Sequence, residues 1–376
     1  MTAHERLAKT MRYEIADRLP LDMVWPRAEI LAALQDHFCA DTVEEVYRRL
    51  HIDFRWLPLA ETYPDFQRRI NGRLEGEMPG AGNAVVFHDS QTFEDAWGAV
   101  QRVGDDGKYI EWKSGPLVDK PDLGDWDLPE VIFPSIEQVQ QALQPYRDVI
   151  TIVEIAFPFK VAWYLCGMEG LLMRMINQLD FVQELYDRIY ARQTQKAVLS
   201  ARAGYDIIAL VGDIAGQNGM MFSPQLFRQL DLPRMRALIK EVKQANPQVQ
   251  VLYHSDGDMQ AVIPMLIEAG VNIINPIQSA CMDPALIKEK YGSRLTLHGT
   301  ISVQDTVPFG TVDEVKAQVR KRIETVGYNG GFILSPENSI PFDTPLENVL
   351  AIYEAALEYD YRSLAAAASI KEKARR

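Results

Sequence analysis

Residues 249–258, VQVLYHSDGD, decide the fold and place one imidazole and two carboxylates in a single turn. The apolar and β-branched run at 249–253 has the composition of a buried strand, and it stops abruptly at the polar residues 254–258. A helical pattern follows at residues 259–269. In α/β proteins the loops at the carboxyl ends of strands line the functional crevice. This turn is therefore either a metal or proton-transfer site or a polar turn held by its own hydrogen bonds.

The same alternation of strand and helix extends to both sides of this segment. We expect strands at residues 21–25, 52–57, 149–156, 207–211, 249–253, 271–275, 295–298 and 332–334. Helical patterns cover residues 3–12, 28–38, 42–50, 135–143, 159–175, 181–203, 224–244, 259–269, 284–291, 312–326 and 345–364. About eight strands separated by helices predict an α/β fold of the TIM-like (β/α)8 barrel type, with an open doubly wound sheet as the alternative.

One region departs from this alternation. Residues 63–134 mix glycines, prolines, aromatic residues and charges without a sustained helical period, and they include short β-like pieces at 84–87 and 109–113. We interpret this region as an insertion that contains a small antiparallel hairpin. The chain is thus expected to form a single barrel domain over residues 1–376, with an N-terminal elaboration.

Composition excludes several classes of function. The formal net charge of −13 disfavours nucleic acids and anionic membranes as partners, because both require a concentrated basic face. No apolar run is long enough to span a bilayer, and the first residues, MTAHER, lack the layout of a signal peptide. Cys39, Cys166 and Cys281 are widely spaced, which suits a reducing compartment and argues against a disulfide framework. We therefore expect a cytoplasmic protein that acts on a small molecule.

The residues that follow the expected strands should share one rim of the barrel. Histidine, carboxylate and thiol groups, the ligand types of zinc, are concentrated in the second half of this rim. The metal-ligand candidates are His254, Asp256, Cys281 and Glu337. The candidates for proton transfer or orientation are Tyr253, His298 and Asp213, and those for substrate contact are Trp25, Arg27, Phe157 and Gln278.

Purely structural roles compete with these functional ones. His254 can hydrogen-bond a backbone carbonyl, and Asp256 can cap the helix that follows it. Cys281 can be an inert, half-buried thiol, and His298 can be a packed core histidine. The residue types by themselves leave both sets of roles open.

Short segments in chain order carry a family resemblance. They are AFPF at 156–159, EG at 169–170, FSP at 222–224, YHSDG at 253–257, NPIQ at 275–278, MDP at 282–284, KYG at 290–292, HGTI at 298–301, SPEN at 335–338 and PLEN at 345–348. Together with RL at 6–7 and DRLP at 17–20, this pattern resembles the uroporphyrinogen decarboxylase-like superfamily, which includes porphyrinogen decarboxylases and zinc-dependent methyltransferases that act with corrinoid proteins. The resemblance implies a TIM-like barrel with its site at the carboxyl ends of the strands.

Two departures from the family pattern bear on function. Porphyrinogen decarboxylases carry an arginine-rich loop after the first strand, whereas residues 23–27, MVWPR, contain Arg27 alone and suit a polycarboxylate poorly. The family's methyltransferases place zinc on a His-x-Cys pair and a late cysteine. This chain has His254 and Asp256 at the pair, and Glu337 or Asn338 at the late position. Carboxylate ligands make a harder metal site, which favours activation of an ether or alcohol oxygen over a thiol.

The resemblance and the rim together imply metal-assisted methyl transfer of the O-demethylation type. A small oxygenated or aromatic substrate would pass its methyl group to a corrinoid or pterin carrier, with zinc as the metal and a corrinoid protein as partner. The alternatives are a metal-free carboxy-lyase with Arg27, Lys160 and Asp213 around its pocket, and a barrel that binds a small ligand without turnover. Members of the family often form homodimers, so the resemblance also implies a dimer.

Overall fold

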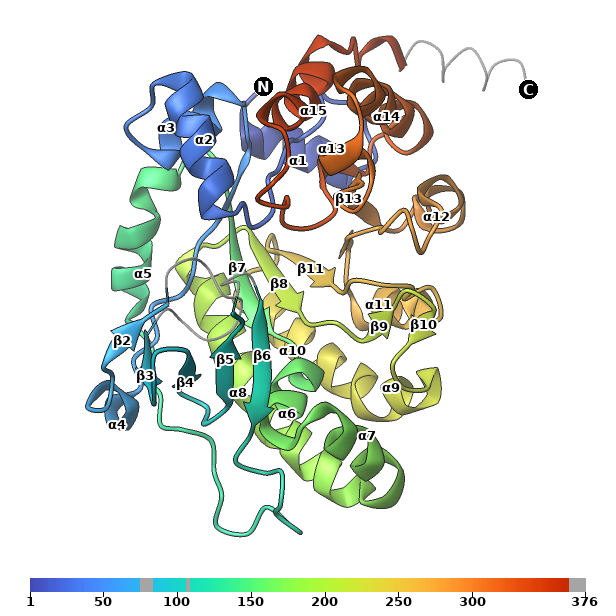
Figure 1. Ribbon diagram of the computed structural model, residues 1–376. Coiled ribbons are helices and arrows are strands. Elements are labelled where there is room, and N and C mark those ends of the chain that lie inside the picture. The colour runs from blue at the N-terminus through green and yellow to red at the C-terminus, as the bar shows by residue number, and fades with distance from the viewer. Residues whose placement is uncertain (75–83, 106–108, 365–376) are drawn as a thin grey trace.

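The apolar, β-branched runs of the sequence form seven parallel strands of one curled sheet (Figure 1). The computed structural model describes residues 1–74, 84–105 and 109–364. The sheet order is β1, β7, β8, β11, β12, β13 and β14, with bounds Phe54–Trp56, Ile150–Ala156, Ile207–Val211, Gln250–His254, Ile273–Asn275, Thr296–Ile301 and Phe332–Pro336. The TIM-like barrel predicted from the sequence is confirmed.

The first expected strand, residues 21–25, is reduced to a single bridge that completes the barrel. Leu21 pairs in parallel with Leu334 of β14, where the Asp22 N–H donates to the Leu334 carbonyl at 3.0 Å. On the other side, the Asp53 N–H donates to the Leu21 carbonyl at 2.8 Å, just before β1. The strand cannot continue because Trp25 has a φ of 42° and Pro26 follows it.

A buried carboxylate fixes this closing segment. Asp53, which is 4% exposed, accepts hydrogen bonds from Arg6 Nη1 at 2.8 Å, from Arg18 Nη1 at 2.7 Å and from the Leu21 N–H at 3.0 Å. Arg6 also pairs with Asp17 at 2.8 Å, so the first helix is linked to the same group. The N-terminal elaboration therefore holds the barrel closed through charge-assisted hydrogen bonds.

Helices surround the strands in the order expected from the sequence. The helices are α1 (Ala3–Met11), α2 (Ala28–Phe38), α3 (Val43–Arg49), α4 (Pro64–Gln67), α5 (Ile136–Leu143), α6 (Pro158–Cys166), α7 (Met168–Asn177), α8 (Leu179–Ala203), α9 (Pro224–Leu230), α10 (Leu232–Ala245), α11 (Ile263–Ala269), α12 (Pro284–Tyr291), α13 (Thr306–Phe309), α14 (Val312–Thr325) and α15 (Leu346–Glu358). No helix in the described part of the chain combines the length and apolar character needed to cross a membrane.

Four of the expected helices differ from the observed ones. The helix expected at 345–364 ends at Glu358, because Tyr359 has an extended backbone. The helix expected at 159–175 breaks at Gly167, whose φ of 75° favours glycine. The helix expected at 224–244 breaks at Asp231, because Pro233 in the next turn has no N–H for a continuous hydrogen-bond ladder. The helix expected at 259–269 begins only at Ile263, so Asp256 is not its N-cap.

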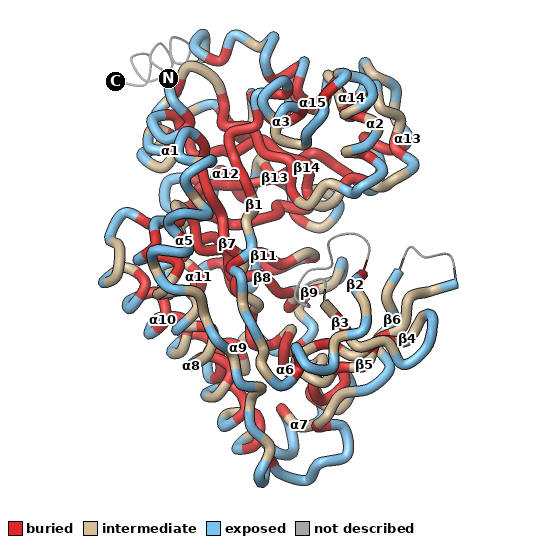
Figure 2. Tube along the Cα trace, turned by 90° about the vertical axis from the view of Figure 1, so that its left-hand side faces the viewer, coloured by how far each residue is buried: buried red, intermediate tan, exposed pale blue. Residues whose placement is uncertain are grey.

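Two apolar layers are separated by the alternation of side chains along the strands. Val251 and Tyr253 of β11 belong to the large core between the sheet and the helices. Leu252 belongs to a second cluster inside the barrel, together with Phe54 and Ile207. His254 lies two residues beyond Leu252 and therefore points to the barrel interior. Figure 2 shows the strands as a continuous buried centre under a more exposed helical layer.

The inserted region forms a sheet that is larger than the expected hairpin. Its ends are joined where Thr62 and Ile132 pair in antiparallel fashion. Five antiparallel strands lie between them: β2 (Gly72–Arg73), β3 (Ala84–Phe87), β4 (Thr92–Glu94), β5 (Val100–Val103) and β6 (Ile110–Ser114). The sheet docks beside α6, where Trp112 Nε1 donates to the Tyr164 carbonyl at 2.8 Å (Figure 1).

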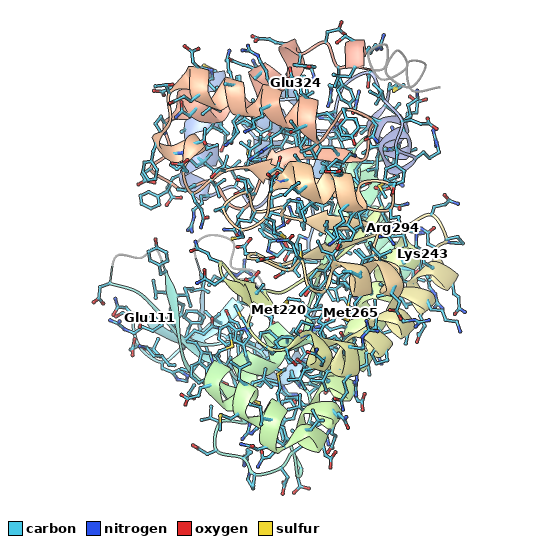
Figure 3. All side chains as sticks on the ribbon, turned by 90° about the vertical axis from the view of Figure 1, so that its right-hand side faces the viewer. Glu111, Met220, Lys243, Met265, Arg294 and Glu324 are labelled. Atoms are coloured by element: carbon cyan, nitrogen blue, oxygen red, sulfur yellow. The ribbon has the colours of Figure 1, made fainter. Side chains whose placement is uncertain are left out.

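The inserted sheet and the amino ends of the barrel strands lie on opposite sides of the molecule. Lys243 and Arg294 precede β11 and β13, respectively. Figure 3 shows these two side chains together on one side, whereas Glu111 of β6 lies on the other. The inserted sheet therefore lies toward the carboxyl ends of the strands, where the candidate residues follow the strands.

Replacing Asp53 tests whether the closing segment depends on this carboxylate. We expect Asp53→Ala to lower the free energy of unfolding by about 3–5 kcal/mol, because it leaves the buried Arg6 and partly buried Arg18 without their partner. Denaturant titration measures this change. Glu14→Ala, which removes an exposed ion pair with Arg12, is the control and should leave the free energy of unfolding nearly unchanged. Equal effects of the two substitutions would contradict the role of Asp53.

A second buried carboxylate makes stability depend on pH. Burial raises the pKa of Asp231 to about 7, although the Tyr190 hydroxyl donates to its Oδ1 at 2.9 Å. An acid with a raised folded-state pKa stays protonated where the unfolded chain is already ionised. The folded state therefore loses stability as the pH rises from the ordinary value of 3.8 toward about 7.

Asp231→Asn should remove this pH dependence, because the amide has no proton to lose. Thermal unfolding at several pH values between about 4 and 8 should give a flatter profile for the variant than for the wild type. Asp125→Asn, at an exposed position, is the control and should keep the wild-type profile. Parallel profiles of the wild type and Asp231→Asn would show that Asp231 does not titrate in this range.

Candidate functional site

Three side chains with metal-binding atoms converge at the carboxyl ends of β8 and β11. Atoms of Asp213, His254 and Asp256 lie within 4.8 Å of one another. His254 Nε2 is 3.7 Å from Asp213 Oδ1, and the same carboxylate oxygen accepts the Asp256 N–H at 2.8 Å. His254 is buried, whereas the Asp213 side chain is 44% exposed, so the group is accessible from the side of Asp213.

The two turns that carry this cluster are locked together by backbone contacts. Gly257 has a φ of 86°, and a Cβ at this position would lie 2.5 Å from the Gly216 carbonyl oxygen. Only glycine fits this close approach. The Asp258 N–H donates to the same carbonyl at 2.9 Å, and the Ile214 N–H donates to Ser255 Oγ at 3.1 Å. Asp213 and Asp256 are thus held in place by their neighbours.

A buried hydrogen-bonded chain orients the His254 ring. Asn275 Oδ1 lies 2.6 Å from His254 Nδ1, and Asn275 Nδ2 lies 2.5 Å from His298 Nδ1. His298 Nε2 lies 2.9 Å from Asp22 Oδ2, which also accepts from Trp56 Nε1 at 3.0 Å. Because the Asn275 oxygen can only accept, His254 carries its proton on Nδ1 and presents a lone pair on Nε2. The lone pair faces Asp213, as a metal ligand requires.

The surroundings of Asp256 shift the pKa of its carboxyl group. Burial raises its pKa, an effect that the neighbouring His254 opposes and the Asp213 charge reinforces. Asn338 Nδ2 donates to Asp256 Oδ2 at 2.6 Å. Two converging carboxylates that are partly withdrawn from water favour a cation, because each is destabilised by the other when both are ionised.

Glu337 and Cys281 are not part of this cluster. In the described part of the chain, the converging group consists of Asp213, His254 and Asp256. Glu337 Oε1 accepts the Ser279 N–H at 2.7 Å, while its buried Oε2 has no hydrogen-bond partner. Burial raises the pKa of Glu337 and of the half-buried Cys281 thiol. These two residues occupy the neighbouring part of the rim, and Asp213 takes the place that we expected for Glu337.

The other predicted site residues are divided between the rim and the core. Tyr253 is fully buried in the helix-facing layer and Phe157 packs against it at 5.1 Å between ring centroids, which argues against roles in proton donation and substrate contact. Arg27 is exposed at the start of α2. Gln278 stabilises the turn that carries Asp256, since its Oε1 accepts the Gly257 N–H at 2.7 Å. His298 lies deep in the barrel and reaches the cluster only through Asn275.

A cavity of about 500 Å³ lies between the barrel rim and the inserted sheet. Asp213, His254 and Asp256 do not line it, but two of its lining residues, Trp25 and Val211, are neighbours of His254. Trp25 lines this cavity, and its ring is 4.7 Å from that of His254 and 5.2 Å from that of Trp56. The Trp25 indole N–H donates to Glu154. The aromatic lining residues are Trp25, Trp56, Tyr63, Phe66, Phe93, Trp97 and Tyr164. A cavity of this size, with aromatic and charged residues in its lining, suits a small, flat ligand that carries polar groups.

Sequence reasoning did not assign the residues that support the cluster. Asn275 ends a strand, and Asn338 follows Glu337, so both lay in segments that already carried the family pattern. Asp22 precedes the MVWPR segment and gave no local sign of a buried charge. Their roles depend on contacts across the barrel, which no sequence spacing reveals.

The donor set of the cluster fits a divalent metal ion. Imidazole nitrogen and carboxylate oxygen are normal zinc ligands, and three protein ligands with one open side are typical of a catalytic rather than a structural zinc site. Metal-binding histidines also usually donate their other ring N–H to a buried acceptor, as the contact of His254 Nδ1 with Asn275 Oδ1 would do here. The arrangement can therefore support Lewis-acid activation of an oxygen atom in a ligand of the adjoining cavity.

Comparisons with known proteins find similar chains with two activities. A family model described as Uroporphyrinogen decarboxylase (URO-D) matches residues 83–359. A uroporphyrinogen decarboxylase from Trichodesmium erythraeum is 24% identical over 375 residues, covering 94% of this chain and 95% of that protein. Methylcobamide:CoM methyltransferase MtaA from Methanosarcina barkeri is 27% identical over 229 residues, covering 61% of this chain and 63% of that protein.

A solved structure supports the fold. A methyltransferase from Methanosarcina mazei superposes with a TM-score of 0.66 at 20% sequence identity. The match covers 95% of this chain and 99% of that chain. The barrel and its inserted region therefore have a counterpart of nearly the same extent.

The series of buried hydrogen bonds from Asp22 to His254 predicts that Asn275 affects metal affinity without contacting the metal. Asn275→Leu should weaken zinc binding by about 10- to 100-fold, because His254 loses the acceptor that sets its tautomer. Competition with a chromophoric chelator measures the affinity. Asn246→Leu, on the far side of the barrel at the end of α10, should leave zinc affinity unchanged. An unaltered affinity in Asn275→Leu would mean that His254 is oriented by other contacts.

Proposed function

This chain belongs to the uroporphyrinogen decarboxylase (URO-D) family, and on that basis we propose that it is a metal-dependent methyltransferase of the O-demethylation type. It would take a methyl group from a small oxygenated or aromatic substrate and pass it to a corrinoid or pterin carrier. The observation that carries this proposal is the convergence of Asp213, His254 and Asp256 beside an aromatic cavity.

The ligand set distinguishes this proposal from the activities of the named relatives. The relative from Methanosarcina barkeri is named for coenzyme M, which is a thiol. In this chain two carboxylates join one imidazole, and Cys281 lies outside the group. A bound divalent ion such as zinc would supply Lewis acidity toward an ether or alcohol oxygen.

The residues of this chain would position the substrate and prepare the leaving oxygen. Trp25 and Trp56 form an aromatic wall that places a flat ring next to His254. The hydrogen bond to Asn275 would place the proton of a neutral His254 on Nδ1 and leave Nε2 as the ligand atom. Glu337 can hold a proton on its unpartnered Oε2 on the same rim, because burial raises its pKa. In the overall reaction the methyl–oxygen bond breaks, the methyl group moves to the carrier, and the leaving oxygen gains a proton.

The competing activity is decarboxylation without a metal. A porphyrinogen carries several carboxylates and requires several arginine partners. The single arginine after the first strand, Arg27, is exposed and does not line the cavity. Lys160 lines the cavity, so a smaller acid with few carboxylates remains compatible with the site. The two activities differ in their need for metal.

Three further parts of the proposal follow from the family and the sequence. The carrier would be a corrinoid bound to a partner protein that approaches the exposed side of Asp213. The enzyme would work in the cytoplasm as a homodimer. Methylation of a corrinoid by the purified enzyme, followed by its absorbance, tests the carrier directly.

Metal content and activity together test the proposal. Wild-type protein purified without chelator should contain stoichiometric zinc or a similar ion and should methylate free cob(I)alamin from methoxylated aromatic compounds. His254→Ala should lose both properties, because it removes the buried nitrogen ligand. His88→Ala, at a half-exposed histidine of the inserted sheet, is the matched control and should keep both. A metal-free wild type that releases carbon dioxide from an acid in the presence of chelator would replace this proposal with decarboxylation.

A further inference from the structure

Arg192 of α8 lines the cavity and lacks a partner for one of its buried nitrogens. Its Nη1 is inaccessible to solvent and makes no hydrogen bond to any described residue. A guanidinium group has five N–H donors and no acceptor, so its charge requires carbonyl or carboxylate oxygens. Arg192 therefore brings to the cavity wall a guanidinium group whose donors are not all filled by the protein.

Lys196 and the acidic residues of the cavity have hydrogen-bond or ion-pair partners within the protein. Lys196 Nζ lies 3.0 Å from Glu61, which also accepts from the Tyr63 hydroxyl at 2.9 Å. Glu154 accepts from the Trp25 indole. Asp95 accepts the N–H groups of Trp97 at 2.9 Å and of Ala99 at 3.0 Å. The acidic groups of the wall are therefore occupied.

Two partly buried cations remain without a carboxylate. Neither Arg192 nor Lys160 forms an ion pair with an acidic side chain of residues 1–74, 84–105 or 109–364. The exposed Arg73 adds a third positive charge to the lining. Glu154 and Asp95 of the lining likewise have no ion-pair partner among the described residues, so we expect anion binding at Arg192 itself and not over the whole lining.

The two cations differ in their neighbours. Lys160 lies within electrostatic range of Asp256 in the cluster, whereas Arg192 lies within range of Tyr63 in the inserted region. Trp25 and Trp56 lie at the cluster side, with Trp25 in contact with His254. A flat ligand with its reacting oxygen at the cluster would therefore direct its far end toward Arg192.

We propose that the substrate is an aromatic carboxylate, whose ring lies against Trp25 and Trp56 and whose carboxylate binds the Arg192 guanidinium. The planar fork of arginine matches the two oxygens of a carboxylate. This assignment rests on the proposed function for the orientation of the methoxy group toward Asp213, His254 and Asp256. The binding of the carboxylate by Arg192 does not require the metal.

Paired probes test the assignment in the wild-type protein without any substitution. The probes are the three isomers of methoxybenzoate and the matching methoxybenzamides, which have nearly the same shape but no charge. Calorimetric titration should show at least one isomer binding about 10- to 100-fold more tightly as the acid than as the amide, the range expected for a charge-assisted hydrogen bond. Equal affinities of acid and amide, or no binding of any acid, would overturn the proposal.

Substitutions then locate the preference. Arg192→Gln should abolish it by weakening the acid while leaving the amide unchanged, and Arg192→Lys should keep part of it because the charge remains. Arg202→Gln, at an exposed position on the same helix, is the matched control and should keep the full preference. A preference that survives in Arg192→Gln would overturn the assignment of this residue.

Metal analysis of the same samples separates this inference from the proposed function. If the wild type contains no metal yet prefers the acid in chelator, the methyltransferase proposal fails and the carboxylate site stands. If the wild type contains metal and methylates the corrinoid but shows no preference, the carboxylate site fails and the methyltransferase proposal stands.

Discussion

The structure depends on a buried carboxylate, Asp22, which connects the closure of the barrel to the candidate metal site. Asp22 is fully buried, and its side chain accepts from the Met23 N–H, from Trp56 Nε1 and from His298. A charge in this position is tolerable only if every acceptor site is filled. The donors come from three separate elements, so they meet only when the strands are in register. Asp22 therefore makes barrel closure and site assembly parts of one event.

The chain from Asp22 to His254 also explains why polar residues occupy the barrel interior. His298 and Asn275 would each be costly as isolated buried groups, but in series each satisfies the next. Each contact in this series fixes the orientation of the next side chain. Asp22 sets the tautomer of His298, His298 orients the Asn275 amide, and Asn275 leaves the His254 lone pair facing Asp213. A contact at the barrel seam thereby determines the chemistry available at the rim.

The barrel and the inserted region contribute different parts of the candidate site. The barrel supplies rigid strand ends, which hold Asp213, His254 and Asp256 in one place. The inserted sheet lies over the rim and encloses with it a space of about 500 Å³ whose lining includes aromatic residues from both parts. Substitutions in the inserted region can therefore change the shape of the cavity without displacing these three residues. Arg192, whose Nη1 has no hydrogen-bond partner among the described residues, belongs to a barrel helix and interacts electrostatically with Tyr63 of the inserted region.

The sequence by itself determined the barrel, the rim and the family, because these depend on local patterns: apolar runs of strand length, helical periodicity and short motifs at strand ends. It also determined that His254 and Asp256 belong together, since they are two residues apart in one turn.

Only the tertiary structure decided the third member of the cluster. Asp213 and Glu337 were equivalent as isolated carboxylates, and the parallel pairing of β8 with β11 brought Asp213 to His254 while Glu337 turned to the Ser279 N–H. Tyr253 was excluded by side-chain alternation, which directs it into the helical layer, and the hairpin expected in the insertion became a five-stranded sheet. The roles of Asp22, Asn275 and Arg192 arise from contacts between distant segments, and such contacts leave no periodic trace in the chain.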